Sequence, residues 1–137
     1  MDLDLLHGRR DPLTVALPFA LVRVTGASME PTLRAGDLLL ARRGASVRPG
    51  DVVLCDLPPD PWGRPRPTAV KRVTGTDPDD PGRWWVESDD PRAGVSSFDP
   101  TVGSLPPEAV HARVILRVRC RKWDLRVRRV GPAPARD

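Results

Sequence analysis

A strand with a lysine at its centre is predicted by the stretch Thr68-Ala69-Val70-Lys71-Arg72-Val73-Thr74-Gly75. Valine and threonine recur along it, and β-branched residues favour strands. Because successive side chains of a strand point to opposite faces, Lys71 shares a face with Ala69 and Val73, whereas Arg72 points the other way. The lysine is therefore expected among small apolar neighbours, away from water.

Short apolar runs next to turn residues recur on both sides of this stretch. Gly36 precedes one run and Pro49-Gly50 precedes another, which is the pattern of strands joined by turns. The predicted strands cover residues 19–25, 37–42, 51–57, 68–75, 83–87 and 113–119. Loops are predicted for residues 58–67, 76–82 and 88–103, and a single helical turn for residues 106–110.

Composition and length point to one mainly β domain. Seventeen prolines and eleven glycines, with no tyrosine, favour short extended segments and turns over long helices. A chain of 137 residues suits a single core. We therefore predict a single antiparallel β-rich domain over residues 13–130, with a flexible leader over 1–12 and a frayed tail over 131–137.

Positive charge is concentrated near the end of the sequence. The formal net charge is +4, and a basic segment opposed only by Asp124 lies between residues 113 and 129. It contains Arg113, Arg117, Arg119, Arg121, Lys122, Arg126, Arg128 and Arg129. We interpret this segment first as a solvated strand face. Contact with an anionic membrane surface is the open alternative, and nucleic acid is a less favoured partner.

Metal sites, disulfides and membrane spans have little support in the sequence. The two cysteines, Cys55 and Cys120, define no disulfide framework, and neither lies at a metal-ligand spacing from a histidine. We expect no metal and no other cofactor. The longest apolar run, residues 13–22, is shorter than the roughly 20 residues that cross a bilayer. A cytoplasmic or soluble protein is expected, with peripheral membrane contact left open.

Ser28 is the candidate for chemistry, within Val24-Thr25-Gly26-Ala27-Ser28-Met29-Glu30-Pro31-Thr32-Leu33. A serine hydroxyl is a weak nucleophile at neutral pH and needs a base, which a desolvated lysine amine can supply. Lys71 is the candidate base, because the water-poor face predicted for it lowers the pKa of a lysine. The pair predicts a hydrolase with a Ser-Lys dyad.

Three ordered blocks resemble signal peptidase I, namely Gly26-Ala27-Ser28-Met29-Glu30-Pro31-Thr32-Leu33, Arg48-Pro49-Gly50-Asp51-Val52-Val53 and Val70-Lys71-Arg72-Val73. The resemblance extends over about residues 17–118. It implies an antiparallel β fold and a serine endopeptidase that removes an N-terminal leader or signal segment from a preprotein, after a small residue. It also implies that Ser28 is the nucleophile, that Lys71 is the general base, and that the backbone N–H of Ser28 donates to the oxyanion.

Further roles around the nucleophile follow from the same resemblance. Gly26 stands where some relatives carry a serine that supplies a second oxyanion donor, and other relatives have glycine there as well. Met29 is expected to line the substrate side, and Pro31 is expected to fix the turn after the nucleophile.

A fourth block departs from the family pattern of a Gly-Asp-Asn run followed by a Ser-x-Asp-Ser run. This chain instead has Ser88-Asp89-Asp90 and Ser96-Ser97-Phe98-Asp99-Pro100. The carry-over gives Asp89 a supporting role at the site and gives Asp99 the role of holding the loop. Ser97, with Ser96 as the competing candidate, is expected to hydrogen-bond and orient Lys71.

Three other functions compete with signal-segment removal. Short relatives without an anchor include proteases that mature nickel-type superoxide dismutase, which makes a soluble maturation protease the main alternative. The dyad also resembles that of self-cleaving LexA-type repressors, but 27 residues before Ser28 are few for a DNA-binding domain and a cleavable linker. A non-enzymatic basic module that binds nucleic acid is the minor alternative, and it leaves the blocks around Ser28 and Lys71 unexplained.

Overall fold

The computed structural model describes residues 3–5 and 18–132, and this part of the chain is mainly antiparallel β, as predicted. Its strands are β1 (Leu3–Leu5), β2 (Phe19–Val24), β3 (Leu38–Arg43), β4 (Val52–Cys55), β5 (Ala69–Asp77), β6 (Asp80–Glu87), β7 (Val110–Arg121) and β8 (Asp124–Arg129). One 3-10 turn, η1 (Pro107–Ala109), precedes β7 where the sequence predicts a helical turn.

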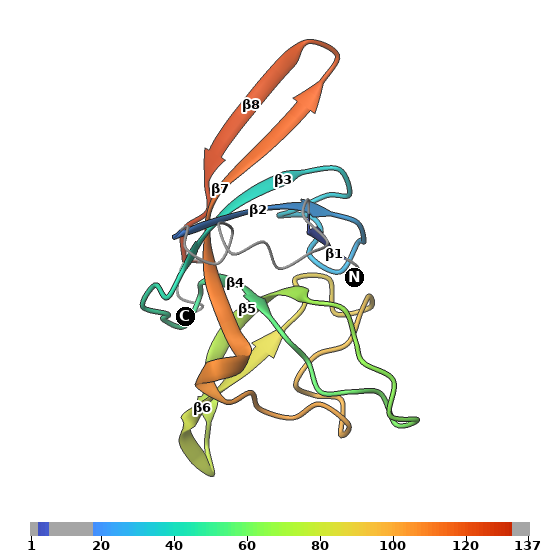
Figure 1. Cartoon of the computed structure of the whole chain (residues 1–137), viewed down its shortest axis with the longest axis vertical. Coiled ribbons are helices and arrows are strands. Elements are labelled where there is room, and N and C mark those ends of the chain that lie inside the picture. Colours follow the sequence, from blue (N-terminus) through green and yellow to red (C-terminus); the bar gives the residue numbers. More distant parts are fainter. Residues whose placement is uncertain (1–2, 6–17, 133–137) are drawn as a thin grey trace.

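All eight strands belong to one sheet in the order β1-β2-β3-β7-β4-β5-β6, and β8 pairs with β7 outside this path. The long strand β7 joins the two halves of the molecule (Figure 1). It pairs with β3 over Ala112 to Val118 and with β4 over Val110 to Arg113. The sheet therefore bends around β7, and irregular register near Leu40 and Leu54 accompanies this bend.

Two apolar clusters form the core, and the strand pair β4–β5 contributes to both of them. Val52, Leu54 and Val70 belong to the cluster under β2 and β3. The neighbouring residues along the same strands belong to the second cluster, which includes Val53, Cys55, Ala69 and Val73. Because side chains alternate along a strand, β5 is covered on both faces and its central part is cut off from water.

The structure differs from the sequence predictions at three places. Residues 3–5, within the predicted leader, pair with β2 as the edge strand β1, while the remaining leader residues and residues 133–137 lie outside the described part. The predicted loop 76–82 is a tight turn, in which the Asp77 carboxylate accepts the N–H of Asp79. The strand β8 was not predicted, because its turn uses Lys122 and Trp123 at positive φ rather than the usual Asn or Gly.

Within the described residues, no helix has the length and apolar character needed to cross a bilayer.

Candidate active site

Ser28 lies in the loop that follows β2, and hydrogen bonds of the backbone fix this loop. The Glu30 N–H donates to the Ala27 carbonyl at 3.1 Å, and the Leu33 N–H donates to the Met29 carbonyl at 2.9 Å. The Asp90 N–H donates to the Ser28 carbonyl at 2.8 Å, which joins this loop to the segment after β6. Ser28 is only 2% exposed, so its hydroxyl is held inside the molecule.

Lys71 lies in β5 and is 1% exposed. Its Nζ donates a hydrogen bond to the Ser88 Oγ at 2.8 Å. Burial lowers the pKa of the Lys71 amine below its ordinary value, because the charged form loses hydration. A thiolate at Cys55 would raise that pKa again, but burial raises the pKa of Cys55 itself to about 12, so this thiol is neutral near pH 7. The environment thus favours an uncharged amine.

Gly94 marks the point where the hydroxyl and the amine meet. A Cβ placed on Gly94 would stand 2.9 Å from Lys71 Nζ, 3.5 Å from Ser28 Oγ and 2.8 Å from Ser28 Cβ. Both polar atoms therefore border the same small space beneath the Gly94 backbone. Gly94 also has a φ of +77°, which L side chains rarely adopt. The close approach and the backbone conformation both require glycine here.

A bidentate ion pair on the other face of β5 joins the segments that carry the site. Arg72 donates from Nε and Nη2 to the two carboxylate oxygens of Asp89, at 2.8 Å each. The same guanidinium donates to the Gly50 carbonyl at 2.6 Å, and the Thr32 hydroxyl donates to Asp89 at 2.6 Å. The loop after the nucleophile, the lysine strand and the segment after β6 are thus held by one network.

The comparison with protein families identifies the chain. Its residues 13–80, about half of the chain, match the family model described as "Signal peptidase, peptidase S26". The chain belongs to this family. The resemblance found in the sequence is confirmed, and the matched residues include both Ser28 and Lys71. No curated protein matches the chain. This signal peptidase is accordingly a peptidase of the serine type, and it is a hydrolase.

Two of the roles expected in this signal peptidase are wrong. Ser97 does not hold Lys71, because its hydroxyl accepts the Val86 N–H at 2.9 Å while its own N–H donates to the Val86 carbonyl. Met29 does not line a substrate surface, because its side chain is fully buried in the core, where its sulfur accepts the Asp89 N–H at 3.4 Å.

The remaining expected residues differ in what they contact. Asp89 joins the loop after Ser28 to the strand of Lys71, through the contacts with Thr32 and Arg72 described above. Asp99 organises its own turn, where its carboxylate accepts the N–H and the hydroxyl of Thr101, and these bonds lower the pKa of Asp99. Gly26 is half-buried in the loop just before the nucleophile. The described residues of the signal peptidase contain no group of three or more side chains suited to hold a metal.

Ser88 and Gly94 are site residues that were not predicted from the sequence. Ser88 had a signal, because it takes the place of glycine in the Gly-Asp-Asn run. An added hydroxyl at the edge of a proposed site is a candidate hydrogen-bond partner for the base. Gly94 had no comparable signal, since glycine is common in loops and its contact with Ser28 and Lys71 joins residues far apart in the sequence.

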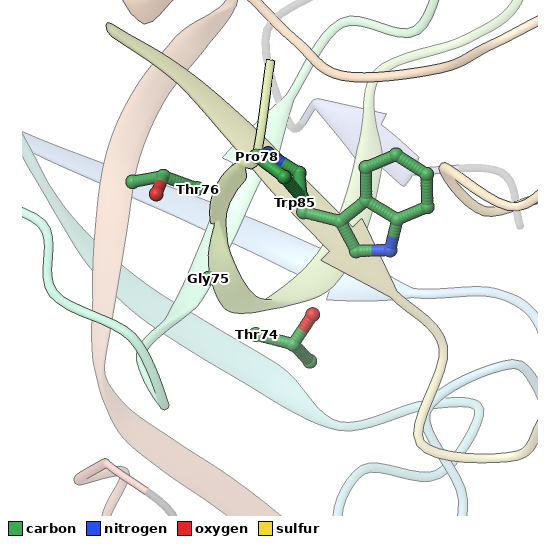
Figure 2. A pocket seen from close by; sticks show the side chains of 5 residues that line it. All are labelled: Thr74, Gly75, Thr76, Pro78 and Trp85. Carbon is green, nitrogen blue, oxygen red and sulfur yellow. The ribbon is translucent and has the colours of Figure 1, made fainter. Parts of the chain in front are cut away.

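A surface hollow of about 260 Å³ lies elsewhere, on the β5–β6 hairpin. Figure 2 shows its lining by Thr74, Gly75, Thr76, Pro78 and Trp85. The ring of Trp85 also meets the ring of Phe98 edge-on, with centroids 5.3 Å apart. Neither Ser28 nor Lys71 lines this hollow, so it is separate from the point at Gly94 where these two side chains meet.

Proposed function

We propose that this signal peptidase cleaves a preprotein with Ser28 as the nucleophile and Lys71 as the general base. The observation that carries the proposal is that Ser28 Oγ and Lys71 Nζ border one point at Gly94, with both residues almost completely buried. A buried amine with a lowered pKa loses its proton more readily than an exposed lysine, as a general base requires. A lysine with only a structural role, by contrast, has no use for a lowered pKa, and its burial only costs hydration.

The reaction has two stages in this proposal. Neutral Lys71 takes the proton of the Ser28 hydroxyl as Oγ bonds to the scissile carbonyl carbon. The resulting ammonium returns that proton to the leaving amine when the C–N bond breaks, which leaves an acyl-enzyme on Ser28. Lys71 then takes a proton from a water molecule whose oxygen attacks the ester. As the bond between the carbonyl carbon and Ser28 Oγ breaks, the ammonium gives this proton to Oγ, and the carboxylic acid product leaves and loses its own proton to solvent.

The backbone N–H of Ser28 is assigned to the oxyanion of the tetrahedral intermediate. Gly26, two residues before Ser28, is half-buried in the same loop and adds no side chain there. Ser88 is assigned the role of positioning the amine, because its Oγ accepts the Lys71 hydrogen bond at 2.8 Å. These assignments leave Asp89 and Asp99 as residues that hold loops.

The substrate assigned to this site is a preprotein with a small residue before the cleavage point. The space next to Ser28 is narrow, since a single added carbon at Gly94 would come within 3.0 Å of the dyad. A small side chain fits such a site better than a large one. Nickel-type superoxide dismutase, whose leader would be removed, remains a predicted substrate of this kind. A gene for such a dismutase next to the gene for this peptidase would support this prediction.

The test is cleavage of a preprotein, or of a peptide spanning its junction, by Ser28→Ala and Lys71→Met. Each change should lower the rate on the order of 10⁶-fold, as removal of a nucleophile or its base does in a serine peptidase. Ser97→Ala is the matched control, because Ser97 is as buried as Ser28 but lies off the dyad. It should retain turnover. Cleavage by folded Ser28→Ala at the wild-type rate would refute the proposal.

Lys71→Arg gives a second, independent check. A guanidinium keeps the positive charge but does not deprotonate near neutral pH, so it cannot serve as a base. The variant should be inactive at every pH at which it is folded. Measurable turnover by this variant would assign the proton transfer to another group.

A further inference from the structure

The basic segment near the end of the sequence is not uniformly solvated. Opposed residues of an antiparallel pair share a face, so the β7–β8 hairpin has a basic face and a mainly apolar reverse face. On the basic face, Arg121, Arg126 and Arg128 are exposed. Arg117 and Arg119 on the same face are half-buried, and both donate hydrogen bonds to other parts of the protein. The interpretation as a solvated face is therefore confirmed for the outer residues and wrong for these two arginines.

The side chain of Arg117 lies on the core side of the sheet. Arg117 is paired with Leu39 of β3, which is fully buried in the cluster under β2 and β3. Because paired residues share a face, Arg117 points toward this cluster. Met29 and Leu33, from the loop that carries Ser28, belong to the same cluster. The guanidinium of Arg117 therefore lies beside the nucleophile loop.

One hydrogen bond joins Arg117 to this loop. Its Nη1 donates to the Thr32 carbonyl at 2.8 Å, although 85 positions separate the two residues in the sequence. Residues 28–33 form a turn closed by its own backbone, and the last carbonyls of such a turn have no donor within it. Arg117 supplies a donor at this end, while the Asp90 N–H binds the Ser28 carbonyl at the other end. The turn is thus held at both ends from outside.

Thr32 also connects the turn to the strand of the lysine. Its hydroxyl donates to Asp89 at 2.6 Å, and Asp89 forms the bidentate pair with Arg72, the neighbour of Lys71. Thr32 is therefore held on its carbonyl from β7 and on its hydroxyl from the network around β5. A shift of Thr32 would change how the turn presents Ser28 to Lys71.

The contacts of Arg117 differ from those of its neighbour Arg119. Arg119 binds both carboxylate oxygens of the buried Asp37 at 2.8 Å, which is a structural ion pair. Arg117 instead binds an uncharged carbonyl, and in the described part of the chain its buried Nε has no hydrogen-bond partner. Burial lowers the pKa of Arg117, because the guanidinium loses hydration. A half-buried cation bound to a carbonyl adds little to stability, which favours a role in placing Thr32.

We propose that Arg117 is a positioning residue for the cleavage reaction. It fixes the Thr32 carbonyl, and through it the orientation of the turn that directs the Ser28 hydroxyl toward Lys71. This inference rests on the proposed function, in which that hydroxyl gives its proton to Lys71. Arg117 acts on the chemical step through Thr32, and it takes no part in the proton transfer itself.

The test is peptide cleavage by full-length Arg117→Met. We expect kcat to fall about 10- to 100-fold with little change in KM, because a displacement of the nucleophile by up to about 1 Å has an effect of this size. The midpoint of denaturant unfolding should change little, since the loss of one hydrogen bond is offset by removal of a half-buried cation. A purely structural role predicts the reverse, which is lower stability with an unchanged kcat of the folded protein.

Two further variants separate the contact from the charge. Arg117→Lys keeps a cationic donor and should recover most of the rate, because the bond to Thr32 is single and does not need the fork of a guanidinium. Arg128→Met is the matched control, since Arg128 is paired with Arg117 on the same face but is exposed. It should turn over like the wild type. If Arg117→Met does not fold, Arg117→Gln replaces it, because its amide is too short to reach the carbonyl.

The pH profile gives a readout that does not depend on stability. In Arg117→Met the plateau of kcat/KM should be lower, but the rise with pH should occur at the same pH as in the wild type. The reason is that the surroundings of Lys71 are unchanged and only the placement of Ser28 differs. A shift of the rise would mean that Arg117 acts on the base instead, and it would contradict the proposed role.

Three other results would overturn the inference. They are a wild-type kcat in Arg117→Met, an equal fall in Arg117→Met and Arg128→Met, and a loss of rate that follows the fraction of unfolded protein. Each of them leaves the proposed function intact as long as folded Ser28→Ala is inactive. Activity of Ser28→Ala would instead refute the proposed function itself, whatever the result for Arg117.

Discussion

Two regions of the molecule depart from the usual distribution of side chains in opposite directions. One is the region around Ser28 and Lys71, named the catalytic end, and the other is the β7–β8 hairpin of residues 116–129, named the ribbon. At the catalytic end, Lys71 is buried, although lysine is almost never fully buried in proteins. On the ribbon, Trp123 is fully exposed, although tryptophan is mostly buried. Both segments carry charged residues next to apolar ones, so the difference comes from what covers them. β5 has a core cluster on each face, and the outer part of β8 has none.

The two regions also use ion pairs differently. The Arg72–Asp89 pair is mostly buried, bidentate and joined to Gly50 and Thr32. The Arg126–Asp124 pair on the ribbon is exposed, and water screens it. Loss of an ion pair that fixes the loops around a buried amine should lower stability, whereas loss of an exposed pair should mainly change the local charge. The catalytic end should therefore be sensitive to small changes that the ribbon tolerates.

Among the substitutions that test this comparison, Gly94→Ala should have the largest effect on turnover. The added carbon would stand 2.8 Å from Ser28 Cβ and 2.9 Å from Lys71 Nζ, so the dyad must separate. We expect a loss of turnover of about 10²-fold or more, since a misplacement of about 1 Å has that effect. The measurement is the rate of peptide cleavage.

Gly63→Ala is the control for Gly94→Ala. Gly63 has a φ of +80°, close to that of Gly94, but a Cβ there meets nothing within 4 Å. Both variants should lose about 1–2 kcal/mol of stability from the left-handed backbone. Only Gly94→Ala should lose activity, and equal activity in the two variants would remove Gly94 from the site.

Ser88→Ala should produce the next largest effect. Removal of the hydroxyl that accepts the Lys71 hydrogen bond leaves the amine free to turn away from Ser28. We expect kcat to fall by about 10- to 100-fold with little change in KM, because a positioning group acts on the chemical step. Ser88→Thr keeps the hydroxyl and should restore the rate. Loss of activity in the threonine variant as well would point to packing instead.

The pH dependence of activity and stability should follow Lys71. Its folded-state pKa lies below the ordinary 10.5, so kcat/KM should rise with pH and level off below that value. Between the two pKa values the unfolded chain binds a proton that the folded chain does not, so stability rises with pH in this window. Lys71→Met should therefore be more stable than the wild type at neutral pH.

The gain from Lys71→Met should shrink as the pH approaches the value of the unfolded lysine. Denaturant unfolding at several pH values measures this gain in stability. Lys122→Met serves as the control, because Lys122 lies in the turn before β8 and is exposed. Equal effects of the two substitutions would show that burial of Lys71 has no energetic cost. A flat profile of kcat/KM from about pH 6 to pH 10 would mean that no lysine of lowered pKa acts as the base.

The smallest effect on turnover is expected from Asp89→Asn. It weakens the bidentate pair with Arg72, and stability should fall by about 2 kcal/mol, within the range for hydrogen bonds to charged groups. Turnover should fall a few-fold as the loops loosen. Asp124→Asn, which removes the exposed pair of the ribbon, should change stability by less than about 1 kcal/mol. A reversed order would mean that the network around Asp89 does not hold the site.

Much of the fold was predictable because strand signals are local. The runs at residues 19–25, 37–42, 51–57 and 113–119 are all strands, with ends within a few residues of the predicted ones. The loop predicted at residues 76–82 is a tight turn closed by the Asp77 side chain, and the strand β8 was not predicted. The turn before β8 has Lys122 and Trp123 at positive φ, and neither residue type signals that conformation.

The site was predictable to a smaller extent. Ser28, Lys71 and Asp89 stand in motifs that can be read along the sequence, and the structure brings them into one region. Ser97 and Met29 were given roles that their contacts exclude. Which of several serines in a loop meets a lysine depends on the path of that loop, and the spacing of residues does not specify this path.

The amino-acid sequence alone determined the family, the mainly β class and the two residues offered for chemistry, because motif order and strand alternation are properties of neighbouring residues. Only the tertiary structure decided that Ser88 receives the lysine hydrogen bond, that Gly94 lies against both Ser28 and Lys71, and that the basic segment has an apolar reverse face. These facts depend on which strands pair and which faces are covered. Burial and contact between residues far apart are set by the whole sheet, so no local stretch encodes them.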